Sequence, residues 1–278
     1  MQSLKKIKEF VLSLPKTEES NYIKRKYNIK NDLGKYPYFY AQEGARLDEF
    51  KRLFGNDYIF CEYRDAFDYI YSREDLATLK GKKYHSKRNH ISAFSKQYNW
   101  KYEKVDSSNT DKVKECAKKW YEENKDRFDD TMECEQKGLY MLLDNMRAFS
   151  ARAGMITVYG NAVAFTVGTP LNENTFDIHI EKALKSYETA YTVINQQFAE
   201  NELRDFEYIN REDDLGLAGL RKAKLSYKPQ KLLKKYFCIP KSDADYVKCR
   251  KIYNEAFEPD LPFDDILFER FFGFVLTY

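Results

Sequence analysis

The segment from Met155 to Ala183, "MITVYGNAVAFTVGTPLNENTFDIHIEKA", decides the fold class of this chain. It contains three short apolar or alternating runs, separated by Gly160-Asn161 and by the Asn-Glu-Asn triplet at 172–174. Both interruptions consist of residues that favour tight turns. The segment therefore predicts an antiparallel meander of three strands.

Helical and strand patterns surround this meander. The basic segment 82–98 carries apolar residues at helical spacing. The expected elements are helices at 82–98, 111–124 and 131–149, then helices at 187–203 and 215–224, with strands at 100–105, 206–210 and 231–239. Two helices before a meander, followed by helix, strand, helix and strand, predict a mixed α/β (α+β) fold.

Composition excludes several classes of protein. The 278 residues are 43% hydrophobic and 16% aromatic, which is incompatible with a disordered chain. No apolar run reaches the roughly 18 residues of a membrane span. The five cysteines show no CxxC spacing, which predicts reduced thiols in a cytoplasmic protein and no metal site.

The net charge of +3 hides two basic segments without acidic residues. Residues 76–102 and 217–242 together hold 15 of the 47 Lys and Arg residues, and the remainder carries 32 cations against 44 acidic residues. Such segregation favours an anionic partner. The alternative is two solvated lysine-rich surfaces.

The run "FDIHIEKA" alternates strictly, so Asp177, His179 and Glu181 are expected on one face of a strand. An edge strand would leave them solvated. A covered strand would place them in a cleft, where burial and mutual charge raise a carboxyl pKa toward that of a general base. We favour the cleft.

The predicted helix 82–98 offers a basic face for a phosphate backbone or another polyanion. Its candidate residues are Lys83, Lys87, Arg88 and His90. Further along, Asp213 and Asp214 have the pattern of a helix N-terminus. No GxGxxG, Walker or GxSxG motif occurs, so neither a nucleotide site of those kinds nor a serine hydrolase is indicated.

Four ordered motifs carry a resemblance to a known family. They are "DYIYSREDLATLKGKKYHSKRNHISAF" (68–94), "FDIHIEKA" (176–183), "AYTVINQQFA" (190–199) and "YINREDDLGLAGLRKAKLSYKP" (208–229). They resemble uncharacterised bacterial proteins related to the C-terminal domain of phosphatidylglycerol lysyltransferase, over roughly residues 59–237. The resemblance implies an acyl-CoA N-acyltransferase (GNAT-type) fold, often present as two tandem lobes.

The implied organisation is a shortened lobe at 1–119 that includes the basic helix, a more complete lobe at 120–240, and an acidic, aromatic helical tail at 241–278. Characterised relatives transfer an aminoacyl group from aminoacyl-tRNA to an amine or hydroxyl acceptor. The chain departs from acetyl-CoA enzymes of this fold at "KSYETA" (185–190), where their glycine-rich phosphate loop is replaced by a sequence containing Glu188.

The resemblance implies a transferase site. Glu181 would be the general base or would position the acceptor, with His179 and Asp177 around it, and Arg221 and Lys224 would neutralise phosphate or an oxyanion. The residues expected to line the acceptor end are Asn195, Asn210 and Glu212, with Tyr227 as a candidate acid. The donor would be aminoacyl-tRNA, and the partners tRNA or an anionic lipid head group. The alternatives are an acetyl-CoA-dependent N-acetyltransferase and a non-catalytic polyanion-binding protein.

Overall fold

The computed structural model describes residues 39–42, 47–54, 58–62, 64–127 and 130–240, and it divides into two compact units. The predicted tail at 241–278 lies outside the described residues. The larger unit comprises residues 69–212 and 221–232. The boundary predicted between residues 119 and 120 falls inside this unit, because the strand at 100–105 pairs with the meander.

The larger unit is built on a seven-stranded sheet of order β4-β5-β6-β7-β8-β3-β9. Its strands are β3 (Asp68–Ser72), β4 (Trp100–Val105), β5 (Arg152–Val158), β6 (Asn161–Pro170), β7 (Thr175–Ala183), β8 (Tyr208–Asn210) and β9 (Lys231–Leu233). Strands β4 to β7 pair antiparallel in sequence order, which confirms the predicted meander.

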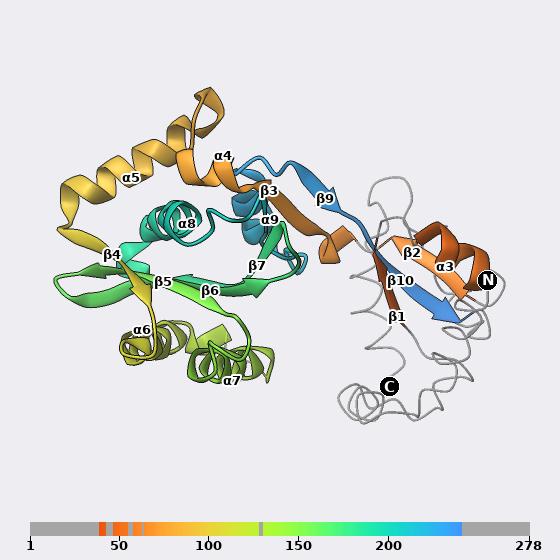
Figure 1. Ribbon diagram of the computed structural model, residues 1–278, viewed down its shortest axis with the longest axis horizontal. Coiled ribbons are helices and arrows are strands. Elements are labelled where there is room, and N and C mark those ends of the chain that lie inside the picture. Colours follow the sequence, from red (N-terminus) through yellow and green to blue (C-terminus); the bar gives the residue numbers. More distant parts are fainter. Residues whose placement is uncertain (1–38, 43–46, 55–57, 63, 128–129, 241–278) are drawn as a thin grey trace. The chain divides into compact units, whose positions relative to one another are not determined.

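Helices cover both faces of this sheet (Figure 1). They are α4 (Arg73–Thr78), α5 (His85–Gln97), α6 (Thr110–Glu123), α7 (Asp130–Asp144), α8 (Ala190–Asn201) and α9 (Ala218–Leu225). Helices α6 and α7 pack on one face around Phe165 and Val167, and α5 and α8 pack on the other face around Ile156 and Ala164. Strands β5 and β6 are therefore buried almost continuously, because helices cover both of their faces.

The smaller unit contains a three-stranded antiparallel sheet of order β1-β10-β2. Its elements are β1 (Phe39–Gln42), α3 (Leu47–Phe54), β2 (Tyr58–Glu62) and β10 (Lys235–Pro240). The single strand predicted at 231–239 is wrong, because this run forms β9 in one sheet and β10 in the other. The sequence predicts an extended backbone there, but pairing partners far along the chain decide which sheet each part joins.

A β-bulge in β7 interrupts the predicted alternation. Val167 of β6 pairs with Ile180, whereas the next residue, Gly168, pairs with Ile178, so His179 is the extra residue. Ile178 packs in the core with α8, whereas Ile180 packs in the core with α6 and α7. The expectation that Asp177, His179 and Glu181 share one face is therefore wrong, since one extra residue moves the following side chains to the opposite face.

Gly168 permits this bulge because no side chain fits at its position. A Cβ atom there would lie 2.0 Å from the carbonyl oxygen of Asp177 and 2.6 Å from Cε1 of Phe176. We expect Gly168→Ala to lower the free energy of unfolding by at least about 2 kcal/mol, because the nearest obstacle is backbone. Urea denaturation measures this change.

Gly138 of α7 supplies the matched control, because a Cβ atom at that position would meet no other element of the described chain within 4 Å. Gly138→Ala should leave stability unchanged or raise it by up to about 1 kcal/mol through helix propensity. Equal effects of the two substitutions would contradict the close approach at Gly168.

Candidate active site

The candidate site lies where β7 and β8 separate. These parallel strands pair only over three residues, from Thr175–Tyr208 to Asp177–Asn210. Beyond Asn210 the chain follows β3 instead, since Arg211 N donates to the carbonyl oxygen of Tyr69 and Tyr69 N donates to that of Glu212. The side chains of these two residues contact β7. Arg211 contacts Glu181, and Glu212 contacts His179.

Glu181 is the centre of a buried cluster on the α8 face of the sheet. Its carboxylate accepts a hydrogen bond from Nη2 of Arg211 at 2.8 Å and another from Nδ2 of Asn195 at 3.1 Å. The side chains of Glu181 and Arg211 are only 8% and 12% exposed. A buried ion pair of this kind is costly to desolvate and is strongly disrupted when one partner is removed.

Three buried polar atoms around Glu181 have no hydrogen-bond partner among the described residues. They are Oδ1 of Asn195, Nη1 of Arg211 and Oγ1 of Thr166. Asn195 and Arg211 contact the Glu181 carboxylate, and Thr166 lies directly opposite Glu181 in the β6–β7 pairing. Buried polar groups are almost always hydrogen-bonded, so these three atoms are exceptions within the described part of the fold.

Two cations contact the ring of Tyr227 beside this cluster. Nζ of Lys87 lies 3.7 Å from the ring centroid, and Cζ of Arg211 lies 4.9 Å from it. The Tyr227 hydroxyl donates to Oγ1 of Thr192 at 3.4 Å. Burial raises the pKa of Tyr227 to about 12 despite the opposing charge of Arg211, so the phenol stays protonated at neutral pH.

Lys87 lies in an environment that disfavours its charge. Burial, and then the neighbouring Arg211, lower its pKa from 10.5 to about 8, although Glu181 opposes the shift. Between these two values the unfolded chain binds a proton that the folded chain does not. The free energy of unfolding therefore rises with pH across this window. Below about pH 8 the folded protein carries the full cost of burying the charged Lys87 side chain.

Replacement of Lys87 by methionine should remove this pH dependence. Between about pH 8 and pH 10.5 the free energy of unfolding of the wild-type protein should rise by about 1–3 kcal/mol relative to that of Lys87→Met. Urea unfolding at several pH values measures the difference, with Lys82→Met at an exposed position as the matched control. Parallel stability curves for wild type and Lys87→Met would show that Lys87 titrates normally.

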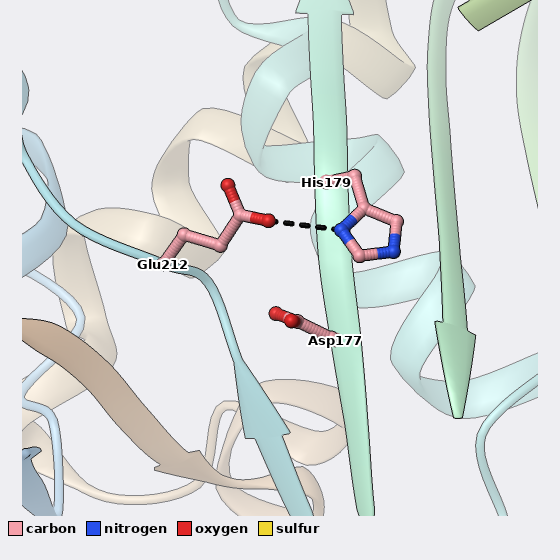
Figure 2. A group of neighbouring side chains, drawn as sticks. All are labelled: Asp177, His179 and Glu212. Atoms are coloured by element: carbon pink, nitrogen blue, oxygen red, sulfur yellow. Dashed lines mark hydrogen bonds and ion pairs between the residues drawn. The ribbon is translucent and has the colours of Figure 1, made fainter. Parts of the chain in front are cut away.

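A second cluster, formed by Asp177, His179 and Glu212, lies on the opposite face of β7. Figure 2 shows Glu212, on the segment after β8, facing the two residues of β7. Nδ1 of His179 lies 2.9 Å from Oε1 of Glu212, and its Nε2 lies 2.9 Å from Oγ1 of Thr169. The hydrogen bond with Glu212 raises the pKa of His179, although burial opposes the shift.

This second cluster also has the spacing of a metal site. One ligand atom from each of its three residues lies within 4.8 Å of the others. A metal ion would have to displace the proton that His179 shares with Glu212. The absence of a metal stays a prediction.

Other residues predicted for the substrate have internal contacts. Lys224 is 8% exposed and its Nζ donates to the carbonyl oxygen of Arg211, which places it inside the fold and not on a phosphate-binding surface. Asn210 is buried, and its Oδ1 accepts from the backbone N–H of Glu212 at 2.8 Å. Both therefore fix the backbone that carries Arg211 and Glu212. Arg221 lies on α9, and the guanidinium that pairs with Glu181 belongs to Arg211.

The four residues predicted to bind a polyanion make different contacts in the structure. Lys87 is buried against Tyr227, and Nδ1 of His90 lies 3.5 Å from Thr192. Arg88 donates to the carbonyl oxygens of Leu79 and Gly81, where α4 ends. Lys83 pairs with Asp75 at 2.7 Å. Lys87 is therefore buried, whereas Lys83, Arg88 and His90 are exposed, and their binding of a polyanion stays a prediction.

Arg211 and Thr166 are the functional candidates that the sequence did not reveal. Arg211 directly follows Asn210 in "YINRED", so its place at the end of a strand was a usable signal. Thr166 lies in an apolar strand and becomes significant only through its pairing with Glu181.

Comparison with known proteins places this chain in a family. The family model described as "Phosphatidylglycerol lysyltransferase, C-terminal" matches residues 19–239. The chain belongs to this family. Its α+β fold is GNAT-like, and two tandem lobes remain a prediction.

Two solved structures are similar to this chain. A conserved protein of unknown function from Bacteroides thetaiotaomicron is 37% identical, with a TM-score of 0.70 over 79% of this chain and 75% of that one. The C-terminal domain of a presumed lysylphosphatidylglycerol synthetase from Agrobacterium fabrum has a TM-score of 0.52 and 14% identity, over 73% and 67% of the two chains.

An uncharacterised protein of Mycoplasmoides gallisepticum is 26% identical over 179 residues, which are 63% of this chain. The chain matches 56% of the length of this curated relative. Among the described residues, no helix has the length and apolar character needed to cross a membrane.

Proposed function

We propose that this member of the phosphatidylglycerol lysyltransferase C-terminal family transfers an aminoacyl group from aminoacyl-tRNA to an amine or hydroxyl acceptor. The observation that supports this most is the buried cluster of Glu181, Arg211, Asn195, Lys87 and Tyr227 where β7 and β8 separate. It combines a carboxylate with two cations, as acyl transfer through an anionic intermediate requires.

The reaction is a displacement at the ester carbonyl. The acceptor nitrogen or oxygen forms a bond to the acyl carbon, and the bond between that carbon and the terminal ribose oxygen breaks. Glu181 accepts the proton that the nucleophile loses, and the ribose oxygen leaves with one proton. Arg211 and Lys87 offset the charge on the carbonyl oxygen, a role assigned from the sequence to Arg221 and Lys224.

The second cluster provides an acceptor side. Asp177 and Glu212 offer carboxylates, and His179 offers an imidazole, on the face of β7 opposite Glu181. This arrangement suits a cationic or hydrogen-bond-donating acceptor.

The anionic body of the tRNA, or an anionic lipid head group, would bind exposed cations such as Lys82, Lys96 and Lys101.

Acetyl-CoA is the alternative donor, and the segment that would bind its pyrophosphate argues against it. The segment before α8 exposes Glu188 where acetyl-CoA enzymes place a glycine-rich phosphate loop. A carboxylate repels pyrophosphate there. A non-catalytic protein would keep the affinity for a polyanion without transfer.

A transfer assay separates these functions. The protein is incubated with tRNA charged with radiolabelled amino acids, with phosphatidylglycerol vesicles and, separately, with a lysine-containing peptide as acceptor. Parallel samples contain labelled acetyl-CoA. Label moving from tRNA to an acceptor supports the proposal, whereas label moving from acetyl-CoA alone would overturn it. Binding of charged tRNA without any transfer would favour the non-catalytic protein.

A further inference from the structure

Asp177, His179 and Glu212 bring two carboxylates and an imidazole together beside β7 (Figure 2). One ligand atom from each residue lies within 4.8 Å of the others. The side chains of His179 and Glu212 are 33% and 44% exposed, so an ion from solution can reach them. Atoms that bind one ion at about 2.1 Å lie at most about 4.2 Å apart, so small rotations of these side chains are enough to enclose an ion.

The backbone that carries Asp177 and His179 is held inside the sheet. Asp177 pairs with Thr169 of β6 on one side and with Asn210 of β8 on the other. His179 is the extra residue of the β-bulge, a feature that commonly redirects a side chain next to a functional site. Two of the three side chains therefore start from fixed positions on one strand.

Glu212 is fixed in an unusual backbone conformation. Its φ of 54° lies in the left-handed region, which costs free energy for a residue other than glycine. Neighbours hold this conformation, because the Glu212 N–H donates to Oδ1 of Asn210 at 2.8 Å and its carbonyl oxygen accepts from Tyr69 N at 3.2 Å. The Glu212 carboxylate therefore faces His179 from a backbone that is already in place.

Thr169 fixes the orientation of the imidazole. Its Oγ1 lies 2.9 Å from Nε2 of His179, whereas Nδ1 of His179 faces Glu212 at 2.9 Å. Because a hydroxyl oxygen accepts hydrogen bonds, Nε2 can carry the ring proton, which leaves a lone pair on Nδ1 on the side of Glu212. Metal-binding histidines almost always have such a partner on their second nitrogen.

We propose that Asp177, His179 and Glu212 bind a divalent first-row metal ion such as Zn²⁺. Imidazole nitrogen and carboxylate oxygen are ordinary zinc ligands, whereas Ca²⁺ takes about six to eight oxygen ligands and Mg²⁺ also prefers oxygen. Three protein ligands leave a position open for an oxygen or nitrogen atom of a substrate. The sequence predicted no metal site from the spacing of its cysteines, and this trio contains no cysteine.

Isothermal titration of Zn²⁺ into the full chain, first freed of metal with a chelator, tests the site. His179→Gln and Glu212→Gln each keep a polar side chain and should weaken binding at least about 100-fold, because each removes a ligand. Thr169→Val should weaken binding about 10-fold, since Thr169 only orients His179. Circular dichroism checks the folding of each variant, and Asp177→Asn replaces a ligand variant that does not fold.

Two substitutions control for other zinc ligands. His85→Gln changes an exposed histidine of α5, and Cys134→Ser removes an exposed thiol of α7, so neither should change the affinity. Titration with Co²⁺ adds a spectroscopic readout. Thiolate ligands give Co²⁺ an intense charge-transfer band in the near ultraviolet, and the ligands proposed here should not.

Three results would overturn the inference. They are no binding of Zn²⁺ at about 1 mM, a concentration that detects even weak ligands, an affinity unchanged by His179→Gln and Glu212→Gln, and loss of binding in His85→Gln or Cys134→Ser, which would mean an adventitious ion only. The inference does not rest on the proposed function. Transfer of label by a chain that binds no zinc would leave that function standing, and zinc binding without transfer would leave the metal site standing.

Discussion

Replacement of Arg211 by methionine is expected to lower the free energy of unfolding by about 3–5 kcal/mol. The substitution leaves the Glu181 carboxylate buried, with its 2.8 Å ion-pair partner removed. It also removes the cation beside the Tyr227 ring. Urea denaturation followed by circular dichroism measures the change.

A double-mutant cycle tests the cause of this loss. The double variant with methionine at both Glu181 and Arg211 carries neither charge of this pair and should be more stable than Arg211→Met alone. Lys137→Met is a surface control, because Lys137 and Glu133 form an exposed ion pair on α7 and should contribute at most about 0.5 kcal/mol. A loss below about 1 kcal/mol for Arg211→Met would contradict the buried pair.

Glu181→Gln is expected to reduce transfer from aminoacyl-tRNA by at least about 100-fold. Glutamine can still accept the hydrogen bond from Arg211, so the local geometry is largely kept, but it cannot take a proton from the acceptor. The rate of transfer is measured below the unfolding transition, with circular dichroism confirming that the variant is folded.

A control substitution makes this result specific. Glu200→Gln changes an exposed carboxylate on α8, the helix that also carries Asn195, and should leave the rate unchanged. A Glu181→Gln variant with the full rate would refute the assignment.

The local sequence was sufficient for the central elements. Turn residues predicted the hairpins of the meander, and helical periodicity predicted α5, α6, α7 and α8. Ser72 caps α4, since its hydroxyl accepts from the backbone N–H of Asp75. These features depend on residues close together in the chain, where spacing alone carries the information.

The assembly of the site was only partly predictable. Glu181 and Asn195 were both singled out and do meet, since "FDIHIEKA" and "AYTVINQQFA" form adjacent elements. Separating His179 from Glu181 required the bulge, which arises because Gly168 lets the backbone of β7 approach β6 closely. Strict alternation in a sequence gives no sign of an extra residue in the pairing.

The sequence by itself determined the meander, the helices that follow it, and the family. Only the tertiary structure decided that Arg211, and not Arg221, neutralises Glu181, and that Lys87 is buried beside Tyr227 and not presented on a basic surface. The physical reason is that burial and charge pairing depend on elements far apart in the chain. Here the chain after β8 no longer pairs with β7 but continues along β3, and the Arg211 side chain can therefore contact Glu181.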